Sequence, residues 1–182
     1  MKSNGSIAII PQPERVEPRR GSFIFDAGTV IVADEFTAAA AAALTGALLP
    51  AVGFVPQVVA SAPKSGGAIV LRLDKKLKEL GAEGYRLEVS PRRATLAAPT
   101  QAGIFHAVQT LRQLLPPEIF ALRPAAGVEW RIPCVSISDR PRFAWRGLML
   151  DTGHDFQRLS YIFRFIDLMA LHKFNVLPWH IC

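Results

Sequence analysis

Acidic, imidazole and indole side chains occur at two places near the C-terminus, each directly after a run of apolar residues. Asp151 follows Leu148–Leu150, and His154 lies three residues further on, while Trp179 and His180 follow a second apolar run. Carboxylates and imidazoles exchange protons and bind polar groups, and an indole ring offers a flat face with one N–H donor. The residue types therefore indicate a binding site for a polar ligand, provided that the fold brings the two places together.

The segment between these places predicts a helix. Its apolar residues recur at helical spacing, and they are Leu159, Ile162, Phe163, Ile166, Met169 and Ala170. With expected strands at 148–150 and 174–177, the order is strand, helix, strand, which is the opening unit of a parallel sheet or a (β/α)8 barrel. In such barrels the ligand site lies at the carboxyl ends of the strands, where Asp151, Trp179 and His180 stand.

Residues 1–140 predict a separate α+β domain, a mixed sheet with two helices on one side. Short β-branched or aromatic runs predict strands at 7–10, 22–25, 29–32, 68–73, 85–89, 94–98 and 134–138, with one more strand before residue 63. One helix is expected from Asp34, as its N-terminal cap, to about Leu49, where Pro50 ends it. A second is expected after Thr100, with its apolar face formed by Ile104, Val108, Leu111 and Leu115.

Composition excludes several classes of protein. Half of the 182 residues are hydrophobic and 20% are charged, which is typical of a globular chain. The net charge of +6 permits an alternative, a nucleic-acid or membrane-surface protein, but the basic residues are scattered, so we expect no nucleic acid. Cys134 and Cys182 form no CxxC pair, and His180 with Cys182 alone is a weak metal motif, so we expect no metal or other cofactor.

No targeting or membrane segment is evident in the sequence. The N-terminal run before Pro11 is too short for a signal peptide, and the uncharged stretch 36–63 is interrupted by Pro50, Gly53 and Pro56. The localisation is left open: as written, the chain is expected to be cytoplasmic, and the alternative is that an export signal lies outside these 182 residues.

The motifs around the candidate site resemble those of glycoside hydrolase family 20, the β-N-acetylhexosaminidases. That family has Arg-Gly, apolar residues, Asp, two residues and Arg-His, then a helix with I-D-x-M-A-x-x-K, then N-x-x-H-W-H. This sequence has "RFAWRGLMLD", "FIDLMALHKFN" and "PWH" in that order and spacing. Upstream, "IIPQP", "EGYRLEV" and "AGIFHAVQTLRQLLP" are similar to the α+β domain that precedes the barrel, so the resemblance extends over nearly the whole chain.

The resemblance implies hydrolysis of terminal N-acetylhexosamine from glycans by substrate-assisted retaining catalysis, in which the acetamido group is the nucleophile. The family uses an Asp-Glu pair, with the glutamate as acid and base. The one Asp-Glu in this sequence, Asp34–Glu35, lies at an expected helix start, where carboxylates are favoured by the helix dipole. After residue 150 the only carboxylates are Asp151, Asp155 and Asp167, and none of them is assigned that role.

Two positions depart from the family pattern. His154 stands where the family has an arginine that binds sugar hydroxyls, and an imidazole cannot reproduce the forked donors of a guanidinium. Pro178 replaces the first histidine of H-W-H and lacks a backbone N–H. Both changes are expected to weaken sugar binding at this edge.

The sequence thus predicts a truncated or degenerate β-N-acetylhexosaminidase, inactive alone, with no catalytic residue in these 182 positions. Domain 1–140 is followed by the first β-α-β of the barrel at 141–182, and Asp151, His154, Trp179 and His180 bind the N-acetylhexosamine of a glycan. The alternative is a non-catalytic α+β module that binds a glycan or a protein. The unfinished barrel segment also favours self-association, because its strand edges and apolar residues lack neighbours.

Overall fold

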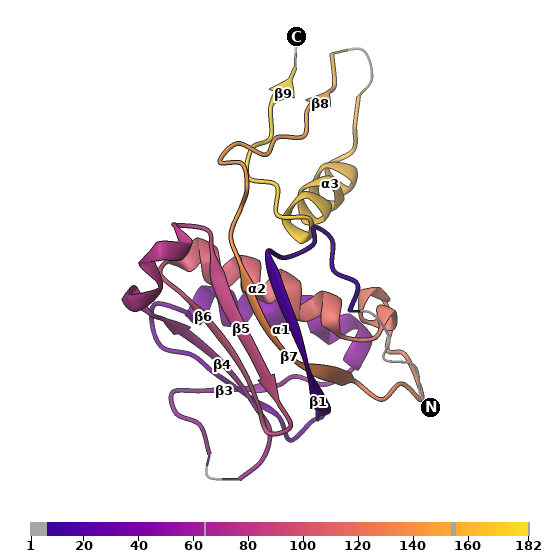
Figure 1. The fold of residues 1–182 in the computed structure, drawn as a ribbon. Coiled ribbons are helices and arrows are strands. Elements are labelled where there is room, and N and C mark those ends of the chain that lie inside the picture. The colour runs from indigo at the N-terminus through magenta and orange to yellow at the C-terminus, as the bar shows by residue number, and fades with distance from the viewer. Residues whose placement is uncertain (1–6, 64, 154–155, 182) are drawn as a thin grey trace. The chain divides into compact units, whose positions relative to one another are not determined.

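A computed structural model of the chain describes residues 7–63, 65–153 and 156–181. The chain separates into two compact units between Arg140 and Pro141. In chain order the elements are β1 (Arg15–Ile24), β2 (Val30–Val32), α1 (Ala38–Val52), β3 (Gln57–Val59), β4 (Ala68–Leu73), the 3-10 helix η1 (Lys75–Leu80), β5 (Tyr85–Ser90), β6 (Arg93–Ala98), α2 (Gln101–Leu114), the 3-10 helix η2 (Pro117–Phe120), β7 (Arg131–Asp139), β8 (Leu150–Asp151), α3 (Leu159–Leu171) and β9 (Trp179–His180) (Figure 1).

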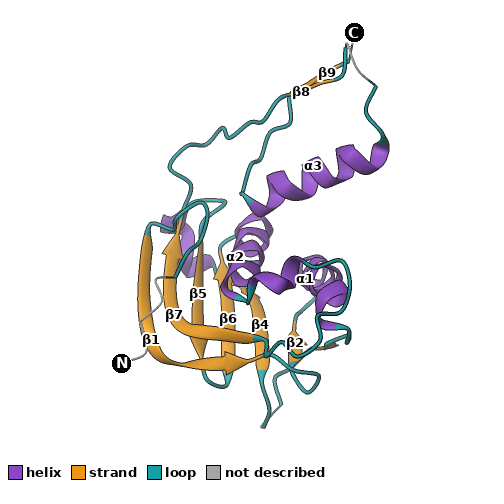
Figure 2. Ribbon diagram, turned by 90° about the vertical axis from the view of Figure 1, so that its right-hand side faces the viewer, coloured by secondary structure: helices purple, strands orange, loops and turns teal. Residues whose placement is uncertain are grey.

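The first unit is built on a mixed seven-stranded sheet with the order β1-β7-β5-β6-β4-β2-β3. Strands β3, β2, β4 and β6 run parallel to one another, and β5 pairs antiparallel with both β6 and β7. Helices α1 and α2 lie on the same side of this sheet (Figure 2). The mixed sheet with few helices that the sequence predicts is confirmed.

The core lies between the sheet and the two helices. In β5 the buried side chains of Tyr85, Leu87 and Val89 alternate with Arg86 and Glu88, which point to the other face. This period of two is the pattern of a strand with one buried face. The opposite face of the sheet therefore carries polar residues and is not covered by α1 or α2.

Helix α2 follows the predicted pattern closely. Thr100 is its N-terminal cap, and its Oγ1 accepts a hydrogen bond of 3.3 Å from the Gly103 amide. Gly103 also lets the helix approach the sheet: a Cβ there would clash with the Gly84 carbonyl oxygen and lie 2.7 Å from Ala98 Cβ. The absence of a side chain at this position is therefore required for the packing of α2 on β6.

A buried polar group ties three elements of this unit together. The Tyr85 hydroxyl on β5 lies 2.6 Å from Thr110 Oγ1 on α2 and donates to Asp139 Oδ2 on β7 at 2.9 Å. Asp139 Oδ1 accepts from the Glu14 amide at 3.2 Å. Burial, followed by the nearby Asp139 charge, raises the pKa of Tyr85 well above its ordinary value. The tyrosine is therefore a neutral donor to a carboxylate under all ordinary conditions.

Two strand predictions for the first unit are wrong in detail. Residues 7–10 form no strand, although Ile9 is buried, and the strand expected at 22–25 is only the end of β1. The earlier part of β1 contains Pro18 and a register shift between Pro18 and Ser22. Proline is tolerated there because β1 is an edge strand, where a missing N–H breaks no pairing on the outer side.

Helix α1 also differs from its prediction. Its N-terminal cap is Thr37, and Asp34 instead accepts from the Thr37 amide at 2.9 Å and from the Thr37 hydroxyl at 2.8 Å. The helix continues through Pro50, because a proline in the last turn removes only one late hydrogen bond. Gly53, with φ of 74°, ends it by donating to the Leu49 carbonyl at 3.0 Å.

In the second unit, strands β8 and β9 are parallel and α3 lies between them in sequence. The second strand was expected at 174–177, but there only Val176 pairs, in an isolated bridge with Gly147. On α3 the predicted apolar stripe is only partly buried: Ile162 and Met169 are buried, whereas Leu159, Phe163 and Ile166 are exposed. Within the described residues, no helix is long and apolar enough to cross a membrane.

Candidate functional site at the ends of β8 and β9

The parallel pairing of β8 and β9 places Asp151 opposite His180 and Leu150 opposite Trp179. The Leu150 amide donates to the Pro178 carbonyl at 2.9 Å, and the Thr152 amide donates to the His180 carbonyl at 3.0 Å. Pro178 therefore acts as an acceptor in this ladder, and its missing N–H does not prevent the pairing with β8. Both strands end together, so three of the predicted site residues stand at one edge.

Asp151 and His180 contact each other directly. Nδ1 of His180 lies 3.2 Å from Asp151 Oδ1, which also accepts from the Gly153 amide at 2.9 Å. The Gly153 hydrogen bond, followed by that of His180, lowers the pKa of Asp151 from its usual value. Because a carboxylate oxygen only accepts, this bond places the hydrogen of a neutral His180 on Nδ1. Asp151 is thus a charged acceptor that is held by two hydrogen bonds.

Trp179 is oriented by a residue that the sequence reasoning missed. Its Nε1–H donates to Thr152 Oγ1 at 3.0 Å, and the same hydroxyl donates to the His180 carbonyl at 3.1 Å. Thr152 was overlooked because its role depends on the register between β8 and β9. The available signal was its place directly after Asp151, where a strand end exposes backbone acceptors that a hydroxyl can reach.

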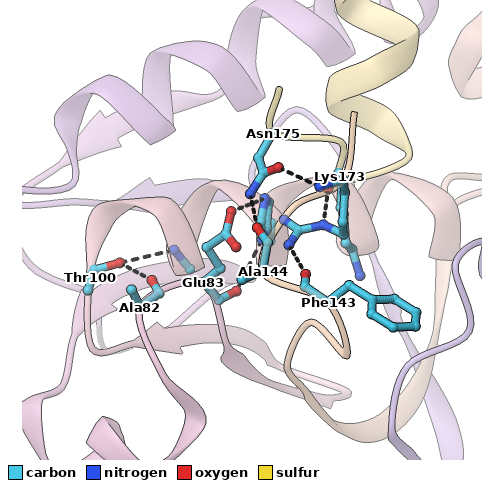
Figure 3. Close-up of polar contacts among 10 residues, drawn as sticks. Ala82, Glu83, Thr100, Phe143, Ala144, Lys173 and Asn175 are labelled. Atoms are coloured by element: carbon cyan, nitrogen blue, oxygen red, sulfur yellow. Dashed lines mark hydrogen bonds and ion pairs between the residues drawn. The ribbon is translucent and has the colours of Figure 1, made fainter. Parts of the chain in front are cut away.

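A second set of hydrogen bonds fixes the base of the same unit. Arg146 donates from Nε to the Lys173 carbonyl at 2.8 Å and from Nη1 to the Phe143 carbonyl at 2.7 Å. Asn175 Oδ1 accepts from the Arg146 amide at 3.0 Å, and its Nδ2 donates to the Ala144 carbonyl at 2.8 Å (Figure 3). The planar guanidinium thus joins the chain segments before β8 and after α3, and it holds the starts of both strands together.

The remaining candidates lie apart from this edge or outside the described residues. His154, predicted to bind substrate, and Asp155 are outside the described residues. The Asp34–Glu35 pair belongs to the other unit, just before α1. In the part of the chain that the structure describes, no group of three or more His, Cys, Asp or Glu side chains could hold a metal ion.

Comparisons with known proteins give the family. Residues 6–140 match the profile of glycosyl hydrolase family 20, domain 2, and residues 143–182 match that of the family's catalytic domain. The β-hexosaminidase of Porphyromonas gingivalis is 33% identical over 96% of this chain and 22% of its own length. The β-N-acetylhexosaminidase of Cellulomonas fimi is 33% identical over 96% of this chain and 34% of its own length.

Solved structures agree with these matches. The family 20 β-N-acetylhexosaminidase of Streptomyces coelicolor superposes with a TM-score of 0.86 at 36% identity, over 94% of this chain and 34% of that one. A mutant Streptomyces plicatus β-hexosaminidase in complex with its product, GlcNAc, has a TM-score of 0.84 at 36% identity and the same coverage. The chain belongs to glycoside hydrolase family 20. It spans between about a fifth and a third of the length of the curated relatives that match most of it.

Proposed function

We propose that this chain supplies the α+β domain, residues 1–140, and the first β-α-β unit, residues 141–182, of a β-N-acetylhexosaminidase whose catalytic domain is a (β/α)8 barrel. The activity is the removal of terminal N-acetylhexosamine from glycans. One observation carries the proposal: Asp151 and His180 pair in register at the carboxyl ends of two parallel strands, within a segment that matches the catalytic-domain profile. Family 20 catalysis is substrate-assisted, so it needs no protein nucleophile.

The exposed apolar side chains of the second unit support its assignment to a barrel. Parallel strands normally have both faces covered, since each is followed by a helix and flanked by other strands. Many large apolar residues of this unit are instead exposed, and, apart from the candidate site residue Trp179, they are Phe143, Trp145, Leu148, Met149, Phe156, Leu159, Tyr161, Phe163, Ile166, Leu168 and Ile181. Further strands and helices of a barrel would bury them.

Each described residue at the strand ends has a role in this proposal. Asp151 accepts a hydrogen bond from a sugar hydroxyl, because its lowered pKa keeps it charged. Trp179 offers the face of an indole whose N–H is already bound to Thr152. His180 orients Asp151 through its Nδ1. Asp151 is unsuited to be the general acid, which requires a raised pKa.

By resemblance, His154 takes the place of the family arginine, and with Pro178 it is expected to lower the affinity for the sugar. A histidine has fewer donors than a guanidinium and is mostly neutral at pH 7. The 182 residues by themselves should not hydrolyse a chromogenic N-acetylglucosaminide, since none of them is assigned as the acid/base glutamate. Loss of a general acid/base lowers the rate by about 10²-fold or more.

A segment exchange tests the proposal. Residues 143–182 of this chain replace the matching segment of the Cellulomonas fimi β-N-acetylhexosaminidase, and hydrolysis of 4-nitrophenyl N-acetyl-β-glucosaminide is measured. The chimaera should turn over, more weakly than its parent, and Asp151→Ala within it should lower kcat/KM by about tenfold or more, the scale of a hydrogen bond to a charged group. Asp167→Ala, on the exposed side of α3, is the matched control and should have little effect. Equal effects of the two substitutions, or a folded chimaera that fails to bind N-acetylglucosamine, would contradict the assigned roles.

A further inference from the structure

The face of the seven-stranded sheet opposite α1 and α2 carries a row of arginines. Strand register aligns one residue from each of five neighbouring strands, in the order Arg15, Ser138, Arg86, Ala97 and Arg72. Adjacent strands lie about 4.8 Å apart, so successive arginines of this row are roughly 10 Å apart at their Cα atoms. All three arginine side chains are exposed, and Nη2 of Arg72 lies 3.4 Å from Asp74 Oδ2.

The carboxylates of the next row are already occupied. Glu17 forms an ion pair with Arg15. Glu88 accepts from Ser136 Oγ at 2.6 Å and lies 3.2 Å from Nη1 of Arg19. Among the described residues, the structure gives Arg86 no hydrogen bond or ion pair, although it stands in the centre of the row. Its guanidinium is therefore available to an anion from outside.

Helix η1 extends the positive charge over the same face. Leu77 and Leu80 pack with Ala97, which points away from the core of the unit. This contact holds η1 on the sheet beside Arg86. The helix carries exposed cations, and with the strand residues the cationic set is Arg15, Arg19, Arg72, Lys75, Lys76, Lys78, Arg86 and Arg93. These outnumber the neighbouring carboxylates, which are Glu17, Asp74, Glu79 and Glu88.

We propose that this surface, called here the arginine face, binds an acidic polysaccharide that bears sulfate or carboxylate groups. The guanidinium fork binds such anions with two parallel hydrogen bonds, and spaced arginines suit a polymer with regularly spaced charges. Hydroxyl groups of Thr95, Ser136 and Ser138 lie between the charged side chains and suit sugar hydroxyls. Binding there is separate from the strand ends of the second unit and does not depend on hydrolysis.

The chemistry of the arginine face favours a polysaccharide over a nucleic acid. Single-stranded nucleic acids are held largely by bases that stack on aromatic rings, and none of the residues named on this face is aromatic. A wide sheet face cannot enter the major groove of a duplex, which admits a helix or a two-stranded ribbon. The surface therefore matches a flexible anionic chain without bases.

Binding of chondroitin sulfate to the 182-residue chain tests the proposal, with the dissociation constant measured by titration calorimetry at several salt concentrations. Affinity should fall steeply as ionic strength rises through about 0.1 M, where the screening length is about 10 Å. Arg86→Ala should weaken binding by about two- to fivefold, the scale of an exposed ion pair, and Arg86→Ala with Arg93→Ala should weaken it further.

Arg123→Ala is the control, because it removes the same charge from an exposed loop residue for which the described residues provide no ion pair. It should leave the affinity nearly unchanged, and circular dichroism melting should show that all variants fold. Three results would each overturn the proposal: no binding at low salt, equal weakening by Arg123→Ala and Arg86→Ala, or tighter binding of duplex DNA than of chondroitin sulfate.

Discussion

Removal of one buried hydroxyl group should destabilise the first unit measurably. In Tyr85→Phe the ring remains, but Asp139 Oδ2 loses a donor at 2.9 Å and Thr110 Oγ1 loses a partner at 2.6 Å. A hydrogen bond to a charged group contributes about 1.5–3 kcal/mol, and the Glu14 amide still donates to the other carboxylate oxygen. We therefore expect the free energy of unfolding to fall by about 2 kcal/mol.

Urea unfolding followed by far-UV circular dichroism at pH 7 measures this change. The chain offers a matched control, because its only other tyrosine, Tyr161, is exposed. Tyr161→Phe should change the unfolding free energy by less than about 0.5 kcal/mol, as is usual for surface substitutions. A loss of under about 0.5 kcal/mol in Tyr85→Phe would refute the argument that the buried carboxylate depends on this donor.

The same residue predicts a pH dependence. Burial raises the pKa of Tyr85 well above its ordinary value of 10.0, so the folded chain retains a proton that the unfolded chain releases. The contribution of the Tyr85 hydroxyl to the free energy of unfolding is therefore at its maximum below pH 10, and it decreases as the pH rises above 10. The slope above pH 10 should be smaller in Tyr85→Phe. An identical slope in both proteins would mean that the hydroxyl is not shielded in solution.

Four further outcomes are expected. Gly103→Ala should lower the unfolding free energy by about 1–3 kcal/mol, because the added Cβ clashes with the Gly84 carbonyl. Gly46→Ala is the control: a Cβ at this exposed helix position meets nothing within 4 Å, so the substitution should raise the unfolding free energy by about 0.5–1 kcal/mol. Equal effects of the two substitutions would contradict the close approach of α2 to the sheet. Carbon-detected NMR titration should give Asp151 a pKa below its ordinary 3.8. The contribution of this carboxylate to stability is therefore lost as the pH falls through that lower value. His180→Ala should raise the pKa of Asp151, whereas the control His172→Ala should leave it unchanged. In the segment-exchange chimaera, His154→Arg should tighten N-acetylglucosamine binding by about tenfold or more, from about 1.5–3 kcal/mol, and unchanged affinity would show that the two residues do not share a place. In limited proteolysis followed by mass spectrometry, the protease should cut within residues 141–182 before it cuts within residues 1–140. Light scattering should detect association of the chain. A monodisperse monomer whose residues 141–182 resist the protease would show that the apolar residues of this segment are already buried.

Elements with a strong internal pattern could be predicted from the sequence. The alternation in β5 and the capped apolar face of α2 depend on nearby residues only, so β5 and α2 were predicted within about a residue of their bounds. The early part of β1 was missed because its sequence has a proline, a glycine and three arginines, and only its pairing with β7 makes it a strand. Local patterns carry no information about such pairing partners.

For the candidate site, too, the sequence predicts the residues near the strand ends but not the contacts between them. Asp151, Trp179 and His180 were selected as candidates from their residue types and their place after apolar runs, and the register of β8 and β9 brings them to one edge. Which of them contact each other could not be predicted, because a shift of one residue would turn every side chain to the opposite face. The role of Thr152 could be recognised only once the register of β8 and β9 was known, because its hydroxyl forms hydrogen bonds with residues of β9.

The interruption in β1 has a consequence for solubility. An edge strand with a continuous row of free N–H and C=O groups is a template on which other chains can polymerise. Here Pro18 lacks an N–H, and the register shift between Pro18 and Ser22 breaks the regular spacing of the outer row. At the opposite edge, β3 is only three residues long. The seven-stranded sheet thus resists growth into fibrils at both of its edges.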